Sequence, residues 1–376
     1  MKELKIFRYD VLIDEKNFCD RVGEIKALAK RSRDMKKTIL FAPRRYGKTS
    51  LVRNVVGSRY KKMSSNHMLV YIDLMDVQSF ESIAQRIQQS LSKSLIENFP
   101  VKTLIKNVAG LIKNLSTNIE FDPVSGMPSI GFSIKNFEIK NGLQQLFEAI
   151  KELSKKYHMM LVLDEFHDIS FVPEAEALFR GFLQELDSTT VFILGSKKHL
   201  LKLMFENANS PLFNYGDEVH LNPISVDDWL FYFQERLSQV DVKIEKEEIS
   251  WITEQMCDVP NAICELGAWL MENFSKTKLS TKTIKSELYR LVDSKQSFHY
   301  LLQGYTENER NVLRKLAANR YVLEPQSMSF LDSLGIPKSS VAKILTKLMD
   351  LGAVEYEPNK GYRISDPILG FFLATH

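Results

Sequence analysis

One segment, Thr38–Val52, constrains the fold of this chain more than any other. A short apolar run leads into Ala-Pro-Arg-Arg-Tyr-Gly-Lys-Thr-Ser, and an apolar helical pattern follows directly. Backbone N–H groups at a helix N-terminus bind a phosphate chain, while a lysine reaches the β- and γ-phosphates and a hydroxyl ligates Mg²⁺. Lys48 and Thr49 supply these side chains, although Ala42 replaces the first consensus glycine. The segment therefore predicts a strand, a phosphate loop and a helix. The residues expected around the phosphates are Ala42, Pro43, Arg44, Arg45, Tyr46, Gly47, Lys48, Thr49 and Ser50.

A second motif, His158–Asp168, supplies the acids that such a loop needs. Its apolar run ends in Asp164 and Glu165. Ligand sites in open parallel sheets lie at the carboxyl ends of the strands, so both acids are expected beside the phosphate loop. We predict that Thr49 and Asp164 hold Mg²⁺ and that Glu165 polarises the attacking water. The alternative is a strand capped by solvated acids, and the presence of both motifs in one chain disfavours it.

A third strand pattern, Val191–Leu194, ends in Gly-Ser-Lys-Lys at the same predicted edge. Ser196 is a candidate to sense the γ-phosphate or to hold the lytic water, which makes the catalytic set Glu165, Lys48 and Ser196. The two lysines that follow Ser196 are more typical of exposed surface. His167 is more typical of a hydrogen-bonded structural histidine than of a catalyst.

Hydrophobic periodicity divides the chain into three parts, 1–224, 225–300 and 301–376. The first alternates strand and helix patterns, which predicts an α/β domain with a parallel sheet covered on both faces. Two alternating runs at about 116–136 flank an Asp-Pro-Val-Ser-Gly turn and predict an inserted β-hairpin. The second part is helical without strands. The third predicts a winged helix, with a helix-turn-helix followed by two strands. The expected strands of the sheet are Thr38–Phe41, Met68–Asp73, Met159–Leu163, Val191–Leu194 and Glu218–Leu221, and the expected helix-turn-helix spans Ser327–Leu334 and Lys338–Leu351.

Composition and charge limit the remaining classes of protein. With 376 residues, 44% apolar and 26% charged, the chain is typical of a multidomain globular protein. No apolar run approaches the ~18 residues of a membrane span, and the N-terminus lacks a signal-peptide core, so we expect a cytoplasmic protein without a membrane partner. Three scattered cysteines argue against a disulfide framework or a zinc site. Residues 1–62 hold 18 Lys+Arg and 7 Asp+Glu, a balance of +11, which fits either a surface for a polyanion or a solvated helix.

These motifs together resemble the archaeal-type ATPases of the P-loop AAA+/STAND assemblage, which also occur in bacteria. The resemblance implies a nucleotide-binding core, a helical lid and a winged helix that closes over ATP or ADP. It also implies that Asp20 and Arg21 lie near the adenine and that Pro260 lies against the base. Two features depart from the family pattern: no arginine follows the Ser-Pro-Leu-Phe segment, so an arginine finger is not identified, and His167 stands where glutamine is common. The resemblance is carried by Phe18–Ile25, Ala42–Ser50, Leu163–His167, Gly195–Lys197, Ser210–Phe213 and Ile364–Phe372.

The sequence therefore predicts an ATP-binding, Mg²⁺-dependent ATPase that acts as a nucleotide-driven conformational switch. One alternative is a slow, ADP-holding sensor in a defence or toxin–antitoxin system. Another is a DNA-binding ATPase of the initiator or transposition-loader type, and a protein partner or a homo-oligomer is also open. Arg44 and Arg45 either steer the nucleotide, bond the lid, pair with Asp217 or another acid, or are simply solvent-exposed charges of the loop.

The winged helix gives an ambiguous signal for DNA. Residues 305–376 hold nine Lys+Arg and eight Asp+Glu, which is far from a basic domain. We therefore expect any DNA contact to be non-specific and to run through the basic segment Lys30–Lys37. The outward polar residues of the second helix are expected to be Ser339, Ser340, Lys343, Thr346 and Lys347.

Overall fold

The computed structural model describes residues 5–98, 115–121, 128–134, 139–332 and 334–375. The chain forms two compact units. The core unit comprises Val22–Ala42 and Lys48–Leu221, and the C-terminal unit comprises Met1–Arg21, Pro43–Gly47 and Asn222–His376. The three-part division at residues 224 and 300 stays a prediction.

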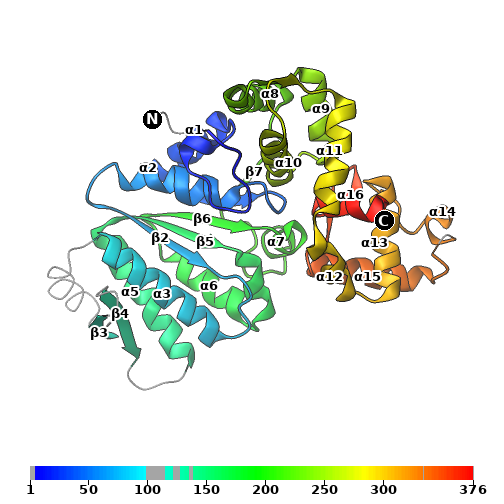
Figure 1. Cartoon of the computed structure of the whole chain (residues 1–376). Helices are drawn as coiled ribbons and strands as arrows, with labels where there is room; N and C mark the ends of the chain where they lie inside the picture. The colour runs from blue at the N-terminus through cyan, green and yellow to red at the C-terminus, as the bar shows by residue number, and fades with distance from the viewer. Residues whose placement is uncertain (1–4, 99–114, 122–127, 135–138, 333, 376) are drawn as a thin grey trace. The chain divides into compact units, whose positions relative to one another are not determined.

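The core unit is built on a five-stranded sheet in the order β2-β5-β6-β1-β7 (Figure 1). All neighbouring strands pair in parallel, which confirms the expected α/β class. β5 and β6 are buried along nearly their whole length, as near-continuous apolar strands in a doubly covered parallel sheet should be. The strands are β1 (Lys37–Phe41), β2 (His67–Asp73), β5 (His158–Asp164), β6 (Thr189–Gly195) and β7 (Asp217–His220). Each expected strand is present, with its ends shifted by at most two residues.

Helices cover both faces of this sheet. α1 and α2 lie on one face and α3, α5 and α6 on the other (Figure 1). The alternation of side chains along β1 shows the same division, because Ile39 and Phe41 belong to the large apolar cluster that packs under α3, α5 and α6, whereas Leu40 does not. The helical segments are α1 (Val22–Arg33), η2 (Ser50–Val56), α2 (Gly57–Lys61), α3 (Phe80–Asn98), α5 (Ile139–Lys156), η3 (Phe166–Phe171), α6 (Ala175–Gln184) and α7 (Lys198–Phe205).

The expected inserted hairpin is present as the antiparallel pair β3 (Leu115–Phe121) and β4 (Pro128–Ile134). Its predicted Asp-Pro-Val-Ser-Gly turn, at 122–126, lies outside the described residues.

In the C-terminal unit, the part expected to be helical, 225–300, is mostly helical, but it also contains a small sheet that the sequence did not predict. β8 (Val242–Lys243) pairs in parallel with β9 (Thr277–Lys278), and two-residue strands are too short to show a period. The expectation of a strand-free segment was therefore wrong. The helical elements here are η1 (Glu15–Asn17), α8 (Val226–Leu237), η4 (Ser238–Val240), α9 (Lys246–Gln255), α10 (Pro260–Asn273), α11 (Thr281–Asp293) and α12 (Gln296–Gln303).

The end of the chain has the elements of a winged helix. They are α13 (Glu307–Asn319), α14 (Met328–Leu331), α15 (Lys338–Asp350), β10 (Val354–Glu357), β11 (Gly361–Ile364) and α16 (Pro367–Thr375). β10 and β11 form the antiparallel wing, and α15 buries Val341, Leu345 and Leu348. The first helix of the helix-turn-helix is only four residues long, shorter than expected. Among the described helices, none is both long and apolar enough to cross a membrane.

Candidate functional site

The core unit contributes the end of the phosphate loop, which fixes Lys48 close to β1. Lys48 is 5% exposed, and its ammonium group donates to the carbonyl of Ala42 at 3.2 Å. The following segment η2 is π-helical, since the N–H of Gly57 bonds the carbonyl of Val52 five residues earlier. π-Helical turns are rare and occur frequently at functional sites. The lysine is thus placed where it can meet a phosphate chain at the start of a helix.

Thr49 and Asp164, the two residues expected to hold magnesium, lie in direct contact. The Thr49 hydroxyl donates to Oδ2 of Asp164 at 2.6 Å, and the N–H of Glu165 donates to Oδ1 at 2.9 Å. Burial and the neighbouring charge of Glu165 raise the pKa of Asp164, although Thr49, a tyrosine hydroxyl and Lys48 oppose the shift. A hydroxyl beside a carboxylate is a suitable donor set for Mg²⁺, and a bound divalent cation would reverse this pKa shift.

Tyr71 is a member of this cluster that the sequence analysis missed. Its hydroxyl donates to Oδ2 of Asp164 at 2.8 Å, and the guanidinium of Arg53 lies 4.5 Å from the centre of its ring. The contact follows from the pairing of β2 with β5, in which Asp73 lies opposite Asp164. The contact between Tyr71 and Asp164 could be predicted only from the strand order, because the sequence around Tyr71 looks like that of any aromatic residue in a buried strand.

Glu165 lies just past the end of β5 in a left-handed backbone conformation, with φ of 47°. Its side chain is 26% exposed. Its Oε2 atom accepts hydrogen bonds from both the N–H and the hydroxyl of Ser196, each at 2.9 Å. Burial alone would raise the pKa of Glu165, but Lys48, His167 and Ser196 outweigh it and hold the pKa below the usual value. Glu165 is therefore an ionised acceptor near Lys48.

His167 and Asp168 extend this cluster under the edge of the sheet. Nε2 of His167 lies 3.1 Å from Oδ1 of Asp168, and the N–H of Asp76 donates to Oδ2 of Asp168 at 2.8 Å. Burial pushes the pKa of Asp168 upward, but His167, the Asp76 amide and Lys197 outweigh it, so the pKa lies below its usual value. Lys197 lies 3.6 Å from Asp168, so its charge has a protein partner.

The tip of the phosphate loop, Pro43–Gly47, belongs to the C-terminal unit and contacts the winged helix there. The Arg44 N–H donates to Oε1 of Glu355 at 3.0 Å, and its guanidinium donates to the Gly352 carbonyl at 3.3 Å. Arg45 forms an ion pair with Asp366. A side chain at Gly352 would meet Arg44, since a Cβ would lie 2.1 Å from Nη1. Both arginines thus contact the winged helix.

Within the C-terminal unit, the acid that pairs with Arg45 is Asp366. In the core unit Asp217 is paired with Arg31 at 2.8 Å. Two of the three uncharged residues of the tip, Tyr46 and Gly47, have structural features of their own. Tyr46 is 5% exposed, and its burial raises the pKa of its hydroxyl. Gly47 has φ of 78°, a conformation that favours glycine.

The residues assigned to the adenine by resemblance also lie in the C-terminal unit. Arg21 is 2% exposed, and its guanidinium donates to the carbonyl of Asn222. Asp20 precedes it, and both have positive φ, which marks a tight reversal of the chain. Pro260 is the first residue of α10. Their contact with adenine stays a prediction, as does the role of each residue of the loop.

One lysine on the polar face of α15 has a charged partner in its own domain. The ammonium group of Lys347 lies 2.6 Å from Oε1 of Glu309 on α13, and Glu309 is buried. Lys347 and Lys343 are both exposed, as expected, but the charge of Lys347 is paired within its own domain.

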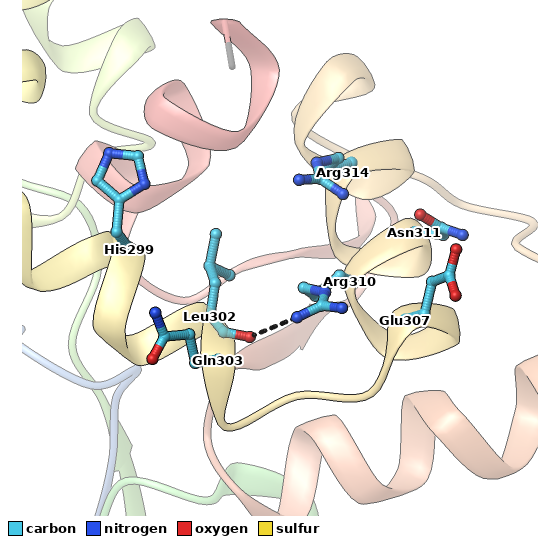
Figure 2. A pocket seen from close by; sticks show the side chains of 7 residues that line it. All are labelled: His299, Leu302, Gln303, Glu307, Arg310, Asn311 and Arg314. Carbon is cyan, nitrogen blue, oxygen red and sulfur yellow. Dashed lines mark hydrogen bonds between the residues drawn. The ribbon is translucent and has the colours of Figure 1, made fainter.

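A cavity of about 320 Å³ is lined by residues of α12 and α13 (Figure 2). None of the phosphate-loop residues is among those that line it. Arg310, Arg314 and Glu307 line it from α13, and His299 lines it from α12. The guanidinium of Arg310 donates to the carbonyl of Leu302 at 3.5 Å. Its lining is mixed in charge, so it does not resemble a preformed phosphate site.

Comparisons with known proteins agree with this geometry. Residues 18–224 match the model of an ATPase domain predominantly from Archaea, and residues 296–375 match a probable winged helix domain. Among curated proteins, no relative matches the chain. Among solved structures, the chain is similar to the Walker-type ATPase paby2304 of Pyrococcus abyssi, with 18% identity, a TM-score of 0.61, and coverage of 98% of this chain and 99% of that one.

Two further solved structures share the fold. They are the ORC1 protein of Aeropyrum pernix in complex with DNA and the ORC2 protein of the same organism in ADPNP–ADP complexes. Each is 13% identical, with a TM-score of 0.53. The ORC1 match covers 99% of this chain and 98% of that one, and the ORC2 match covers 100% and 97%. These likenesses show the fold. Because the family model matches more than half of the chain, the protein belongs to the ATPase domain family found predominantly in Archaea and is an ATP-binding ATPase.

Proposed function

We propose that this ATPase hydrolyses Mg²⁺-bound ATP at the edge of β5 and β6 and acts as a nucleotide-driven conformational switch. The observation that carries the proposal is the connected set of Thr49, Asp164, Glu165 and Ser196 in the core unit, with Lys48 close enough to influence the pKa of both acids. These residue types are the ones that phosphoryl transfer to water requires.

Each member of the set has a distinct task in the proposal. Lys48 binds the β- and γ-phosphates, and Thr49 and Asp164 hold the magnesium ion, which neutralises charge on the phosphates when bound. Glu165 is ionised and partly exposed, so its carboxylate accepts the proton of the attacking water. Ser196 keeps that carboxylate in place through two hydrogen bonds.

The switch is supported by the contacts of the loop tip inside the C-terminal unit. A phosphate loop binds anions through its backbone N–H groups, and here the N–H of Arg44 is already bonded to the carboxylate of Glu355. A nucleotide phosphate and the carboxylate of Glu355 compete for this donor. Binding of the nucleotide then releases Glu355, and the change is transmitted to the wing, because Glu355 also pairs with the buried Arg363.

A second candidate function is that of a DNA-binding ATPase, favoured by the winged helix and by the fold shared with an ORC1 protein solved in complex with DNA. The charges around α15 do not favour sequence-specific reading, because Lys347 is paired with Glu309. The basic segment Lys30–Lys37, at the end of α1 and after it, is a better candidate for contact with DNA than α15. Within it, Lys30, Arg33 and Lys36 are exposed.

The experiment that tests the catalytic proposal is a comparison of Glu165→Gln with the wild type. Glutamine keeps the hydrogen bond to Ser196 but does not accept a proton from water, so we expect unchanged ATP affinity and hydrolysis slowed by ~10²-fold or more. Equal hydrolysis rates would reject Glu165 as the base. A wild type that retains ADP and shows no hydrolysis would instead favour a nucleotide sensor of the STAND type. Sizing the protein with ADP and with ATP tests whether a second copy takes part.

A further inference from the structure

His167 occupies a position that the proposed chemistry has not used. Its side chain is almost completely buried, and its two ring nitrogens face different carboxylates. Nδ1 lies 3.4 Å from Oε2 of Glu165, and Nε2 lies 3.1 Å from Oδ1 of Asp168. A histidine that only filled space would not need an acid on each side. The imidazole ring is therefore oriented with its Nε2 edge toward Asp168 and its Nδ1 edge toward Glu165.

The end of β6 is shaped to receive this ring. A Cβ on Gly195 would lie 2.8 Å from Nδ1 of His167 and 2.9 Å from Cδ1 of Leu201, so only a residue without a side chain leaves room for the ring. The next residue, Ser196, supplies both hydrogen bonds to Oε2 of Glu165. The last residue of β6 and the residue that follows it therefore serve the same carboxylate oxygen: Ser196 bonds it, and Gly195 leaves room for the imidazole beside it.

The far side of the ring is anchored to other parts of the core unit. Asp168 accepts a hydrogen bond from the N–H of Asp76, which follows β2. Lys197 lies 3.6 Å from the same carboxylate. His167 is thus held against a carboxylate that is itself fixed by two other segments, so its position relative to Glu165 is determined by the fold.

The two oxygens of Glu165 have different surroundings. Oε2 faces Ser196 and His167, whereas among the described residues no hydrogen bond to Oε1 is found. A general base works best when its carboxylate is fixed and one oxygen points at the proton it removes. The 3.4 Å approach of Nδ1 is a contact rather than a full hydrogen bond, and such contacts commonly shorten when substrate is bound.

We propose that His167 is a positioning residue for the catalytic glutamate: it holds Oε2 of Glu165 together with Ser196, so that Oε1 faces the attacking water. The proposal rests on the proposed role of Glu165 as the base. His167 itself contacts neither the phosphate loop nor the reacting atoms in this account. Its loss should therefore lower kcat and leave the KM for ATP nearly unchanged.

Two substitutions of His167, by asparagine and by glutamine, provide the test, because each keeps a polar group near only one of the two ring nitrogens. The amide nitrogen of asparagine stands near the place of Nδ1, and that of glutamine stands near the place of Nε2. We expect His167→Asn to keep kcat within about threefold of the wild type and His167→Gln to lose about tenfold, both with unchanged KM, as expected for the loss of one polar contact. A purely structural role, exerted through Asp168, predicts the opposite order. That order, or a wild-type kcat for His167→Gln, would overturn the proposal.

Gly195→Ala offers a second route that leaves every polar group in place. Its Cβ displaces the imidazole from Glu165, and we expect the same loss in kcat with a retained KM. A folded Gly195→Ala protein with wild-type kcat would also overturn the proposal, even if the His167 variants did not fold. Glu165→Gln is measured in parallel. If it is slow while His167→Gln is normal, only the inference about His167 fails; if Glu165→Gln is itself normal, the proposed base fails and this inference fails with it.

Discussion

Replacing Lys48 by methionine removes one buried charge from the phosphate loop and keeps most of the side chain's length. In the structure the Lys48 ammonium group is 3.2 Å from the Ala42 carbonyl, with the residue almost fully buried. A hydrogen bond to a charged group contributes about 1.5–3 kcal/mol, and a phosphate chain offers this ammonium more than one oxygen. We therefore take about 3 kcal/mol for the loss. Because 1.4 kcal/mol is tenfold in affinity, Lys48→Met should weaken ATP binding by about two orders of magnitude.

The assay is a titration of each protein with a fluorescent ATP analogue in the presence of Mg²⁺. Lys36→Met is the matched control, since Lys36 is exposed and immediately precedes β1, at the opposite end of the strand from the phosphate loop. It should bind the analogue as the wild type does. If Lys48→Met also binds with wild-type affinity, the assignment of the phosphate loop is refuted.

Three further predictions follow from other contacts. Asp366→Asn releases Arg45 from a partly exposed ion pair of about 0.2–1 kcal/mol, so ATP should bind up to about fivefold more tightly; weaker binding would contradict the proposed competition between nucleotide and winged helix. The pKa of Asp168 is lower in the folded protein than in the unfolded chain, where it is about 3.9. The ionised carboxylate therefore stabilises the folded state above about pH 3.9, and this stabilisation is lost as the pH falls through the pKa of the folded protein. The melting-temperature gap between wild type and Asp168→Asn should thus shrink below about pH 4, and a gap constant down to pH 3 would refute this. Replacing Lys343 and Lys347 by alanine should change the slope of log DNA affinity against log salt by less than one unit, not by the nearly two units of two phosphate contacts.

The sheet was predictable from the sequence because each of its strands is a short apolar run followed by polar or turn-forming residues. Burial of both faces makes such runs nearly continuous in β5 and β6, which distinguishes them from the flanking helices. The order of the strands was not predicted. β8 and β9 were missed because two-residue strands carry no periodicity.

The residues at the edge of β5 were predictable for a different reason. Lys48, Thr49, Asp164 and Glu165 lie in two short motifs, and the rule that ligands bind at the carboxyl ends of parallel strands brings those motifs together without further information. The contact between Thr49 and Asp164 agrees with this rule.

Contacts that depend on strand order or on distant segments could not be predicted. Tyr71 reaches Asp164 because β2 lies next to β5, and Gly195 admits His167 because β6 lies on the other side. Arg44 and Glu355 are 311 positions apart in the sequence. In that case a local pattern shows only that a charged residue is present and cannot show which partner it meets.

In the proposed mechanism, Glu165 activates the water that attacks ATP bound at Lys48 and Thr49. A single-turnover measurement tests it most directly: excess protein is mixed with Mg²⁺-ATP, and the conversion of bound ATP to ADP is followed for wild type and Glu165→Gln at equal occupancy. We expect both proteins to bind ATP equally and Glu165→Gln to convert it ~10²-fold or more slowly. Equal conversion rates in the two proteins at full occupancy would contradict the role of Glu165 as the base.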